Sequence, residues 1–342
     1  MMIFASALLA ASLVTPVTFT TSDGERLGGE VFRPENATGD LPGLLLVHGS
    51  GKGNSWRELE TEAKAFAAQG LVVMVTDKRS TGYSKTHRDY GQLADDALRA
   101  FAVLKRQPGV GKAGIWGLSE GGWVAPIAAS RSPQVDYLVT VGGPGLSPLR
   151  TQSWNALNKL DRAGVQGSLR HSYASTLHRL AGNAGLFPEA YYDPAATLGK
   201  LTQPVLALWG AQDNQVMPAE SAERFEATVR SGLTVKFFPG APHSLEMGDG
   251  LAPGYPQALA SWVKRVAAGD TPAPSADPLP DQRPRSLDTP ASAWWETWPV
   301  QLGGMLAMLL AFLWYGVRRR TPGAWHARLV AICGALSIAG MV

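Results

Sequence analysis

The chain has 342 residues, of which 45% are hydrophobic and only 17% are charged. This many apolar side chains can bury a large core, which excludes a disordered or strongly acidic chain. The net charge is only +3 and no face is obviously basic, so the sequence gives little support for nucleic-acid binding. The single cysteine, Cys333, excludes an internal disulfide framework and a zinc site built from cysteines.

The amino-terminal end is apolar. Residues 2–14 are small or hydrophobic, and no charged residue precedes Asp23. This run has the length of the hydrophobic region of a signal peptide and is too short to cross a bilayer comfortably. A basic amino-terminal region is missing, and a buried first strand or helix is the alternative. We expect residues 1–16 to form a signal peptide.

From residue 17 to 268, apolar strand-like runs alternate with segments of helical period. Asp23-Gly24 predicts a hairpin between two strands within 17–33. Continuous apolar runs such as Leu44–Val47 predict strands that are buried on both faces. The other predicted strands are 71–76, 113–118, 137–141, 205–209 and 234–238, and the predicted helices are 57–69, 93–104, 121–131, 218–231 and 255–268. The alternation predicts an α/β fold, with a mainly parallel sheet covered by helices on both faces.

The alternation is interrupted once, by a stretch of roughly sixty residues between two predicted strands. A loop of that length without structure is unlikely in a compact domain. Helix-like patterns lie around 152–162 and 168–181. The sequence therefore predicts a small helical cap inserted at about 145–203.

The carboxyl-terminal part has a different composition. Residues 269–297 are rich in Pro, Ala, Ser and Asp and predict an extended linker. Residues 298–317 carry no charge, are flanked by tryptophans and are followed by three arginines, 318–320, which predicts a transmembrane helix ending in the cytoplasm. This orientation places residues 1–297 in the periplasm or outside the cell. The apolar run in 324–342 predicts a second, truncated span.

A candidate nucleophile lies in the segment Gly117-Leu118-Ser119-Glu120-Gly121. This G-x-S-x-G pattern follows a predicted buried strand and precedes a predicted helix. A sharp turn between the two would expose the serine hydroxyl, while the glycines let neighbouring backbone approach closely. The alternative, a plain helix N-cap, uses the same residue type. The context favours Ser119 as a nucleophile.

A serine nucleophile needs a base and an acid that orients the base. In the chain order of strand–G-x-S-x-G–helix hydrolases, the acid and then the histidine follow the serine. Asp213 and His243 each come directly after a predicted strand, where open α/β sheets place their sites. His171 and His178 precede Asp213 and belong to the predicted cap. We therefore expect Asp213 and His243 to complete a catalytic triad.

Acyl transfer also needs donors for the oxyanion. His48-Gly49-Ser50-Gly51 follows the first core strand, and its glycines permit backbone N–H groups to face the site. We expect one donor from Ser50, or less favourably Gly51, and the second from the backbone N–H of Glu120. His48 is expected to brace this loop. A tight turn that needs only glycine is the alternative.

The segment 17–268 resembles the α/β-hydrolase superfamily. The resemblance is carried by HGSG at 48–51, DKRSTGYS at 77–84, GLSEGG at 117–122, WGAQD at 209–213 and PHS at 242–244. The motifs are most similar to those of bacterial esterases of the serine-aminopeptidase-like and dienelactone-hydrolase-like group. The resemblance implies a triad of Ser119, Asp213 and His243, and it implies that Asp77 and Arg79 help to hold the loop beside the site.

The sequence thus predicts a membrane-tethered serine hydrolase that cleaves carboxylic esters without a metal or an organic cofactor. Its predicted partners are a small ester or peptide-like substrate and the membrane. A serine peptidase, a thioesterase and an acyltransferase remain alternatives because only the leaving group or the final nucleophile changes. A peptidase would need an anionic group to hold a substrate amino terminus. A non-catalytic scaffold or membrane sensor is the alternative from another class.

Overall fold

The computed structural model describes residues 12–35, 38–50, 53–291, 293–318 and 325–339. Within them, nine strands form one sheet in the order β1-β2-β4-β3-β5-β6-β7-β8-β11. The strands are β1 (Ser12–Thr20), β2 (Arg26–Pro34), β3 (Leu41–Val47), β4 (Val72–Thr76), β5 (Val110–Leu118), β6 (Tyr137–Val141), β7 (Val205–Gly210), β8 (Leu233–Phe238) and β11 (Ser275–Ala276). All pairs from β4 to β11 are parallel, and β1 and β2 are antiparallel additions, so the predicted mainly parallel sheet is confirmed.

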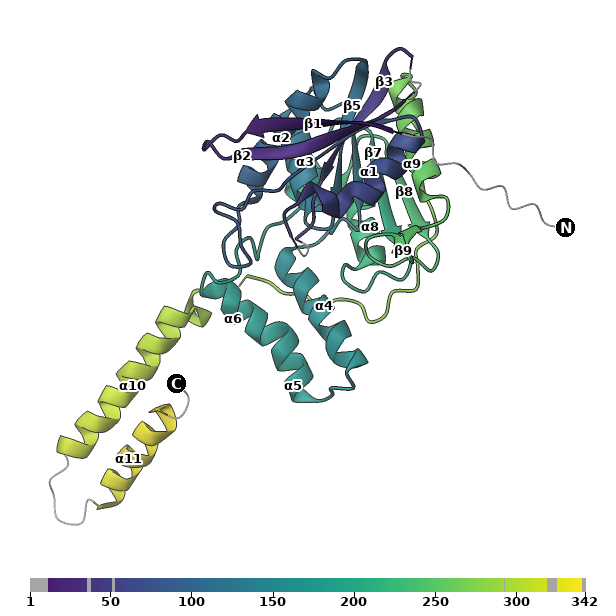
Figure 1. The fold of residues 1–342 in the computed structure, drawn as a ribbon. Helices are drawn as coiled ribbons and strands as arrows, with labels where there is room; N and C mark the ends of the chain where they lie inside the picture. The colour runs from purple at the N-terminus through teal and green to yellow at the C-terminus, as the bar shows by residue number, and fades with distance from the viewer. Residues whose placement is uncertain (1–11, 36–37, 51–52, 292, 319–324, 340–342) are drawn as a thin grey trace.

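Helices cover both faces of this sheet (Figure 1). Those of the main domain are α1 (Glu60–Ala68), α2 (Tyr90–Lys105), α3 (Gly121–Arg131), α7 (Ala195–Leu198), α8 (Pro218–Thr228) and α9 (Tyr255–Ala267). In β3, Leu45 packs into the core formed with α2, α3 and α8, whereas Leu44 and Leu46 pack into the core formed with α1 and α9. The continuous apolar runs thus alternate between two cores, as a sheet buried on both faces requires.

The amino-terminal hairpin begins earlier than the sequence analysis predicted. β1 and β2 pair in register from Ser12 opposite Pro34 to Thr20 opposite Arg26, around a turn in which Gly24 has a φ of 92°. Residues 12–16, assigned to the signal peptide, instead form the first half of β1. The alternating pattern of this edge strand was masked by the apolar run before it. Residues 1–11 lie outside the described residues.

A helical cap follows β6. It consists of α4 (Pro148–Arg162), α5 (Ser168–His171), the π-helical turn Ser172–Thr176 and α6 (Leu177–Asn183). α6 packs against α4, and both extend away from the sheet on the side where the carboxyl-terminal helices lie (Figure 1). The cap thus lies between the core strands β6 and β7 in the chain, as the sequence predicted.

The segment predicted as an extended linker makes contacts with the domain. β11 adds a parallel edge to β8 at Ser275 and Ala276. Further on, the side chain of Gln282 accepts from the backbone N–H of Ala219, at the start of α8, at 3.0 Å, and Trp154 of the cap donates to the carbonyl of Pro284 at 2.7 Å. A Pro-rich chain is extended, and an extended chain can pair with a sheet edge and donate or accept along its length. The sequence pattern predicted an extended segment but did not predict these contacts.

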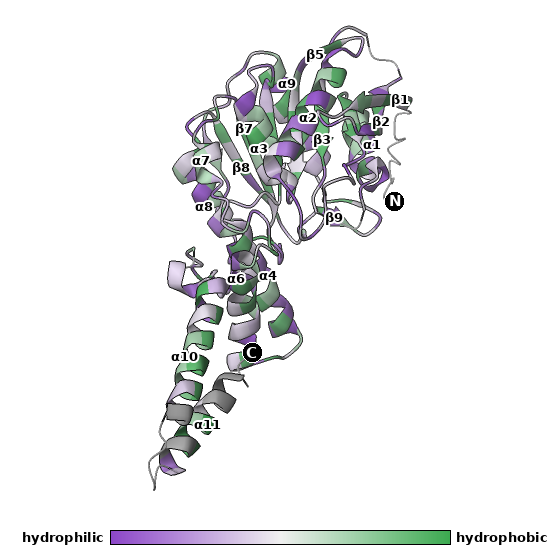
Figure 2. Cartoon of the chain, turned by 90° about the vertical axis from the view of Figure 1, so that its left-hand side faces the viewer, coloured by the Kyte–Doolittle hydropathy of each residue, from purple (hydrophilic) through white to green (hydrophobic). Residues whose placement is uncertain are grey.

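Beyond this segment, the short turn Trp294–Glu296 leads into α10 (Trp298–Arg318), and α11 (Trp325–Ala339) folds back along it (Figure 1). Figure 2 shows α10 as mostly hydrophobic along its length. Within the described residues, one helix segment, Trp298–Tyr315, is long and apolar enough to cross a membrane. α11 has 15 residues, fewer than the roughly 20 that a span requires.

Candidate active site

Ser119 lies at the sharp turn between β5 and α3. Its φ is 55°, in the left-handed region that a residue with a side chain rarely adopts, and its backbone N–H donates to the carbonyl of Val141 at 2.9 Å. Strain of this kind persists only where surrounding structure holds it, and it gathers at functional sites. The G-x-S-x-G motif thus forms the strained turn that its sequence context predicted.

Glycines let the backbone close in around this turn. A Cβ at Gly49 would lie 3.1 Å from the Cβ of Ser119, and a Cβ at Gly121 would lie 2.6 Å from the carbonyl oxygen of Val47. A side chain at Gly121 would therefore separate α3 from β3, and one at Gly49 would press on the serine. These two positions bring the loop after β3 directly against Ser119.

Asp213 and His243 come together at the ends of β7 and β8. The Nδ1 of His243 lies 2.7 Å from the Oδ2 of Asp213, and both side chains are buried. The other Asp213 oxygen accepts from the backbone N–H groups of Gln215 and Val216, which fixes the carboxylate. The Nε2 of His243 is buried and has no partner among the described residues. It lines the same pocket as Ser119.

Close backbone packing holds the imidazole. A Cβ at Gly142 would lie 2.7 Å from the His243 ring, so only glycine fits there. Two residues after the histidine, Leu245 has a φ of 60° and is fully buried, which bends the chain into the short β9–β10 hairpin (Glu246–Met247 and Gly250–Leu251). The histidine is therefore placed by a strained loop, as the serine is.

Two contacts hold the start of the loop after β3. His48 is buried and its Nε2 lies 2.7 Å from the carbonyl oxygen of Thr76; burial lowers the pKa of His48 to about 4, so the ring is neutral at pH 7. Lys78 donates to the carbonyl of Gly49 at 2.9 Å. Ser50 lines a pocket with Ser119, and Gly51 lies outside the described residues. The hydrogen bond from Lys78 keeps the carbonyl oxygen of Gly49 directed toward the lysine side chain.

The side chain of Glu120 is the centre of a buried ion network that the sequence analysis missed. It pairs with Lys78 through one oxygen and with Arg88 through the other, and the hydroxyl of Tyr83 donates to it at 2.7 Å. Burial lowers the pKa of Lys78, and the pairing with Glu120 opposes that shift. Sequence reasoning had given Glu120 only a backbone role, because its partners are 42 and 32 residues away.

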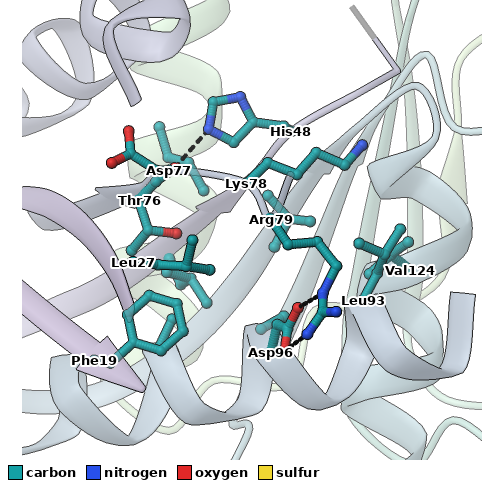
Figure 3. A pocket seen from close by; sticks show the side chains of 15 residues that line it. Phe19, Leu27, His48, Thr76, Asp77, Lys78, Arg79, Leu93, Asp96 and Val124 are labelled. Carbon is teal, nitrogen blue, oxygen red and sulfur yellow. Dashed lines mark hydrogen bonds and ion pairs between the residues drawn. The ribbon is translucent and has the colours of Figure 1, made fainter. Parts of the chain in front are cut away.

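Asp77 and Arg79 lie on either side of Lys78 and act on different elements. Asp77 accepts from the backbone N–H of Trp56 at 2.9 Å, next to the loop after β3. Arg79 instead faces Asp96 on α2 (Figure 3) and also binds Asp23 in the β1–β2 turn. Arg79 thus fastens the amino-terminal hairpin to α2. An apolar cavity lies beside this pair, lined by side chains that include Phe19, Leu27, Leu93 and Val124 (Figure 3).

Two pockets meet at Ser119. The pocket on the α1 side is lined by Ser50, Glu58, Glu62, Gln215, His243, Glu246 and neighbouring backbone. The pocket on the cap side is lined by Arg88, Tyr90, Trp123, Phe187 and residues of α4. A substrate whose reacting carbon lies at Ser119 can therefore extend in two directions. Among the described residues, no group of three or more His, Cys, Asp or Glu could hold a metal ion.

Glu62 is the most unusual residue of the α1-side pocket. Only 1% of it is exposed, and neither carboxyl oxygen has a hydrogen-bond partner among the described residues. Burial raises the pKa of Glu62 to about 7. A signal was present in the sequence, since Leu59, Glu62, Ala63 and Phe66 form one helical stripe and the other three are apolar core residues.

Comparisons with known proteins agree with this fold. Residues 42–188 match the family described as the alpha/beta hydrolase fold. The chain is 26% identical over 264 residues to the esterase EstD of Thermotoga maritima, which covers 69% of this chain and 63% of that protein. It is 27% identical over 226 residues to a 2-hydroxy-6-oxononadienedioate/2-hydroxy-6-oxononatrienedioate hydrolase of Burkholderia vietnamiensis, covering 57% of this chain and 77% of that one.

Among solved structures, an esterase from Pyrococcus furiosus is similar, with a TM-score of 0.53, 17% identity and coverage of 76% of this chain and 92% of that one. This likeness concerns the fold. Together with the family match over residues 42–188, it supports the α/β-hydrolase fold that the sequence predicted. The chain spans less than two thirds of the length of EstD.

Proposed function

We propose that this protein is a serine hydrolase that cleaves carboxylic esters through an acyl-enzyme. The observation that supports it most is the strained Ser119, which lines one pocket with His243, whose other ring nitrogen is bound by Asp213. These three residues have the roles that ester hydrolysis needs: nucleophile, base and orienting acid.

In the proposed reaction, the Ser119 oxygen attacks the ester carbonyl carbon and its proton passes to the Nε2 of His243. The backbone N–H groups of Ser50 and Glu120 stabilise the negative oxygen, with Gly51 as the alternative to Ser50. His243 then gives the proton to the departing alcohol. Water attacks the acyl-enzyme by the same path, which releases the acid and restores Ser119. Asp213 holds the imidazole and stabilises its charged form throughout.

The test uses a serine-reactive fluorophosphonate probe and a chromogenic short-chain ester. Ser119→Ala should abolish labelling and lower turnover by several orders of magnitude, because the members of a triad act as a unit. Ser130→Ala, near the carboxyl end of the following helix α3, is the matched control and should keep both. Turnover by Ser119→Ala within tenfold of the wild type would refute the nucleophile assignment. If the probe labels neither the wild type nor Ser130→Ala although both are folded, the result would favour a non-catalytic scaffold.

We also propose that α10 tethers the enzyme to a membrane. Trp294, Trp295 and Trp298 are exposed at the start of the helix, where interfacial aromatics lie in membrane proteins. The cap supports the same arrangement. Its exposed apolar side chains are Leu169, Tyr173, Leu177, Leu180 and Leu186. They lie on the side of the domain from which α10 extends, and Arg179 of α6 pairs with Glu296 at 2.8 Å.

The orientation is tested with two reporter fusions in a bacterial host. Alkaline phosphatase fused after residue 290 should be active, because it needs an oxidising exterior. A fluorescent protein that matures only in the cytoplasm, fused after Arg320, should be fluorescent. The arginines at 318–320, which follow the uncharged run 298–317 in the sequence, predict this result. The opposite pair of outcomes would place the catalytic domain in the cytoplasm.

A further inference from the structure

The two carboxyl oxygens of Glu62 lack partners although the residue is almost completely buried. A buried carboxyl group without hydrogen bonds is costly, and most proteins avoid it. Glu62 also belongs to the pocket that contains Ser119 and His243. An unsatisfied acceptor beside a nucleophile is typical of a position at which a bound molecule supplies the donor.

The charged side chains that the structure describes in the lining of this pocket are acidic. Glu58 and Glu246 line it together with Glu62, and Glu246 contributes to raising the pKa of the buried carboxyl. No lysine or arginine is among the described residues of its lining. His48, which also lines it, is neutral at pH 7 because its pKa is lowered by burial. An anion would be repelled here, whereas a cation would be attracted.

We propose that the α1-side pocket binds a primary or secondary ammonium group of the substrate, with Glu62 as its principal partner. The inference rests on the proposed function in one respect, since the ammonium group belongs to the ester or amide whose carbonyl Ser119 attacks. The substrate class is thus an amino-acyl or amino-alkyl ester, or the related amide. A peptidase would need an anionic group to hold the amino terminus of its substrate. Glu62 on α1 would supply that group, and not a residue of the cap.

Ammonium chemistry fits this carboxyl better than a quaternary amine does. A primary ammonium carries three N–H donors and can donate to both unpartnered oxygens, whereas a quaternary amine has none. Charge-assisted hydrogen bonds of this type are the stronger ones in proteins. A cation within about 4–6 Å would also favour the ionised carboxylate, which burial alone disfavours.

The kinetic test compares esters in which an ammonium group replaces a methyl group of the same size. β-Alanine methyl ester against methyl butanoate probes the acyl side, and 3-aminopropyl acetate against butyl acetate probes the alcohol side. For at least one pair, kcat/KM of the wild type should favour the ammonium ester. Glu62→Gln should reduce that preference by about 10- to 100-fold. Glu60→Gln, on the solvent-facing side of the same helix, should leave it unchanged.

A binding experiment separates this inference from the proposed function. Ser119→Ala keeps the pocket but cannot turn over the ester, so β-alanine methyl ester should raise its Tm more than methyl butanoate does. The double variant with Glu62→Gln should lose the difference. Preferential binding without wild-type turnover would refute the proposed hydrolysis and keep the ammonium site. Equal binding, or a wild-type preference that Glu62→Gln leaves intact in both pairs, would refute the ammonium site.

Discussion

Two glutamates beside Ser119 are equally buried and differ in their surroundings. Glu120 and Glu62 are each 1% exposed. Glu120 is paired with two cations and a tyrosine hydroxyl, whereas neither oxygen of Glu62 has a partner among the described residues. Burial disfavours the charged form of any carboxyl group. The comparison shows that burial alone does not indicate what a carboxyl group does.

The difference assigns the two sides of the site different tasks. On the Glu120 side, the ion network joins α3 to the chain after β4, and Lys78 also holds the loop that carries the proposed oxyanion donor. The chain itself satisfies those charges, so that side is fixed in the free protein. On the Glu62 side, no described residue supplies a donor, and in our proposal a bound ammonium group does so. We therefore expect substitutions to affect stability on the first side and selectivity on the second.

The largest effect is expected from Glu120→Gln. The substitution keeps the shape of the side chain but leaves Lys78 and Arg88 buried without their counter-charge. Breaking a buried ion pair from one side costs about 3–5 kcal/mol. Urea unfolding of the wild type and the variant at one pH measures the change. A loss below about 1 kcal/mol would mean that the two cations find water or other partners, and the contrast between the two glutamates would disappear.

Glu62→Gln should change stability with the opposite sign and in a pH-dependent way. Since the pKa of Glu62 is raised from 4.5 to about 7 in the folded protein, its stabilising contribution is fully present below pH 4.5 and is lost as the pH rises through 7. Glutamine does not titrate. The free energy of unfolding of the variant relative to the wild type should therefore rise between pH 4 and pH 8, by up to about 3 kcal/mol. A constant difference across this range would show that the carboxyl is satisfied.

A third buried carboxylate, Glu220, sharpens the comparison because several of its partners come from the segment predicted as a linker, in addition to Arg150 of the cap. Gln282 and Ser286 both donate to it, and the Gln282 oxygen accepts from the backbone at the start of α8. Gln282→Ala should cost about 1–3 kcal/mol, since it leaves buried groups unsatisfied. Asp281→Ala, at an exposed neighbour, is the control. Equal unfolding midpoints for both variants would mean that the contacts of this segment do not stabilise the domain and that it is only a linker.

The smallest effect is expected from Glu60→Gln on the outer face of α1. Glu60 pairs with Lys64 at 2.8 Å, and both side chains are substantially exposed. Exposed pairs at this helical spacing contribute only about 0.2–0.5 kcal/mol. The free energy of unfolding should change by no more than that. A change as large as that of Glu62→Gln would mean that helix charge, and not burial, governs both positions.

Much of the fold followed from local patterns. The continuous apolar runs predicted β3 to β8, and the helical periods predicted the helices that cover them, because burial on both faces leaves a strong signal in the sequence. β11 escaped notice, since it is a two-residue edge strand in a Pro-rich segment without apolar alternation. The start of β1 was hidden for the opposite reason, because its residues continue an apolar run that is typical of a signal peptide.

For the site, the sequence by itself determined the candidates whose chemistry depends on position along the chain. Ser119 at a strand-to-helix turn, with Asp213 and His243 after two later strands, follows from motif and order alone. Only the tertiary structure decided which buried charges have partners. Lys78 and Arg88 reach Glu120 across 42 and 32 residues, and nothing in the fold reaches Glu62 within the described residues. Periodicity reports which face of an element is buried, but compensation of a charge depends on groups that the fold brings together from distant parts of the chain.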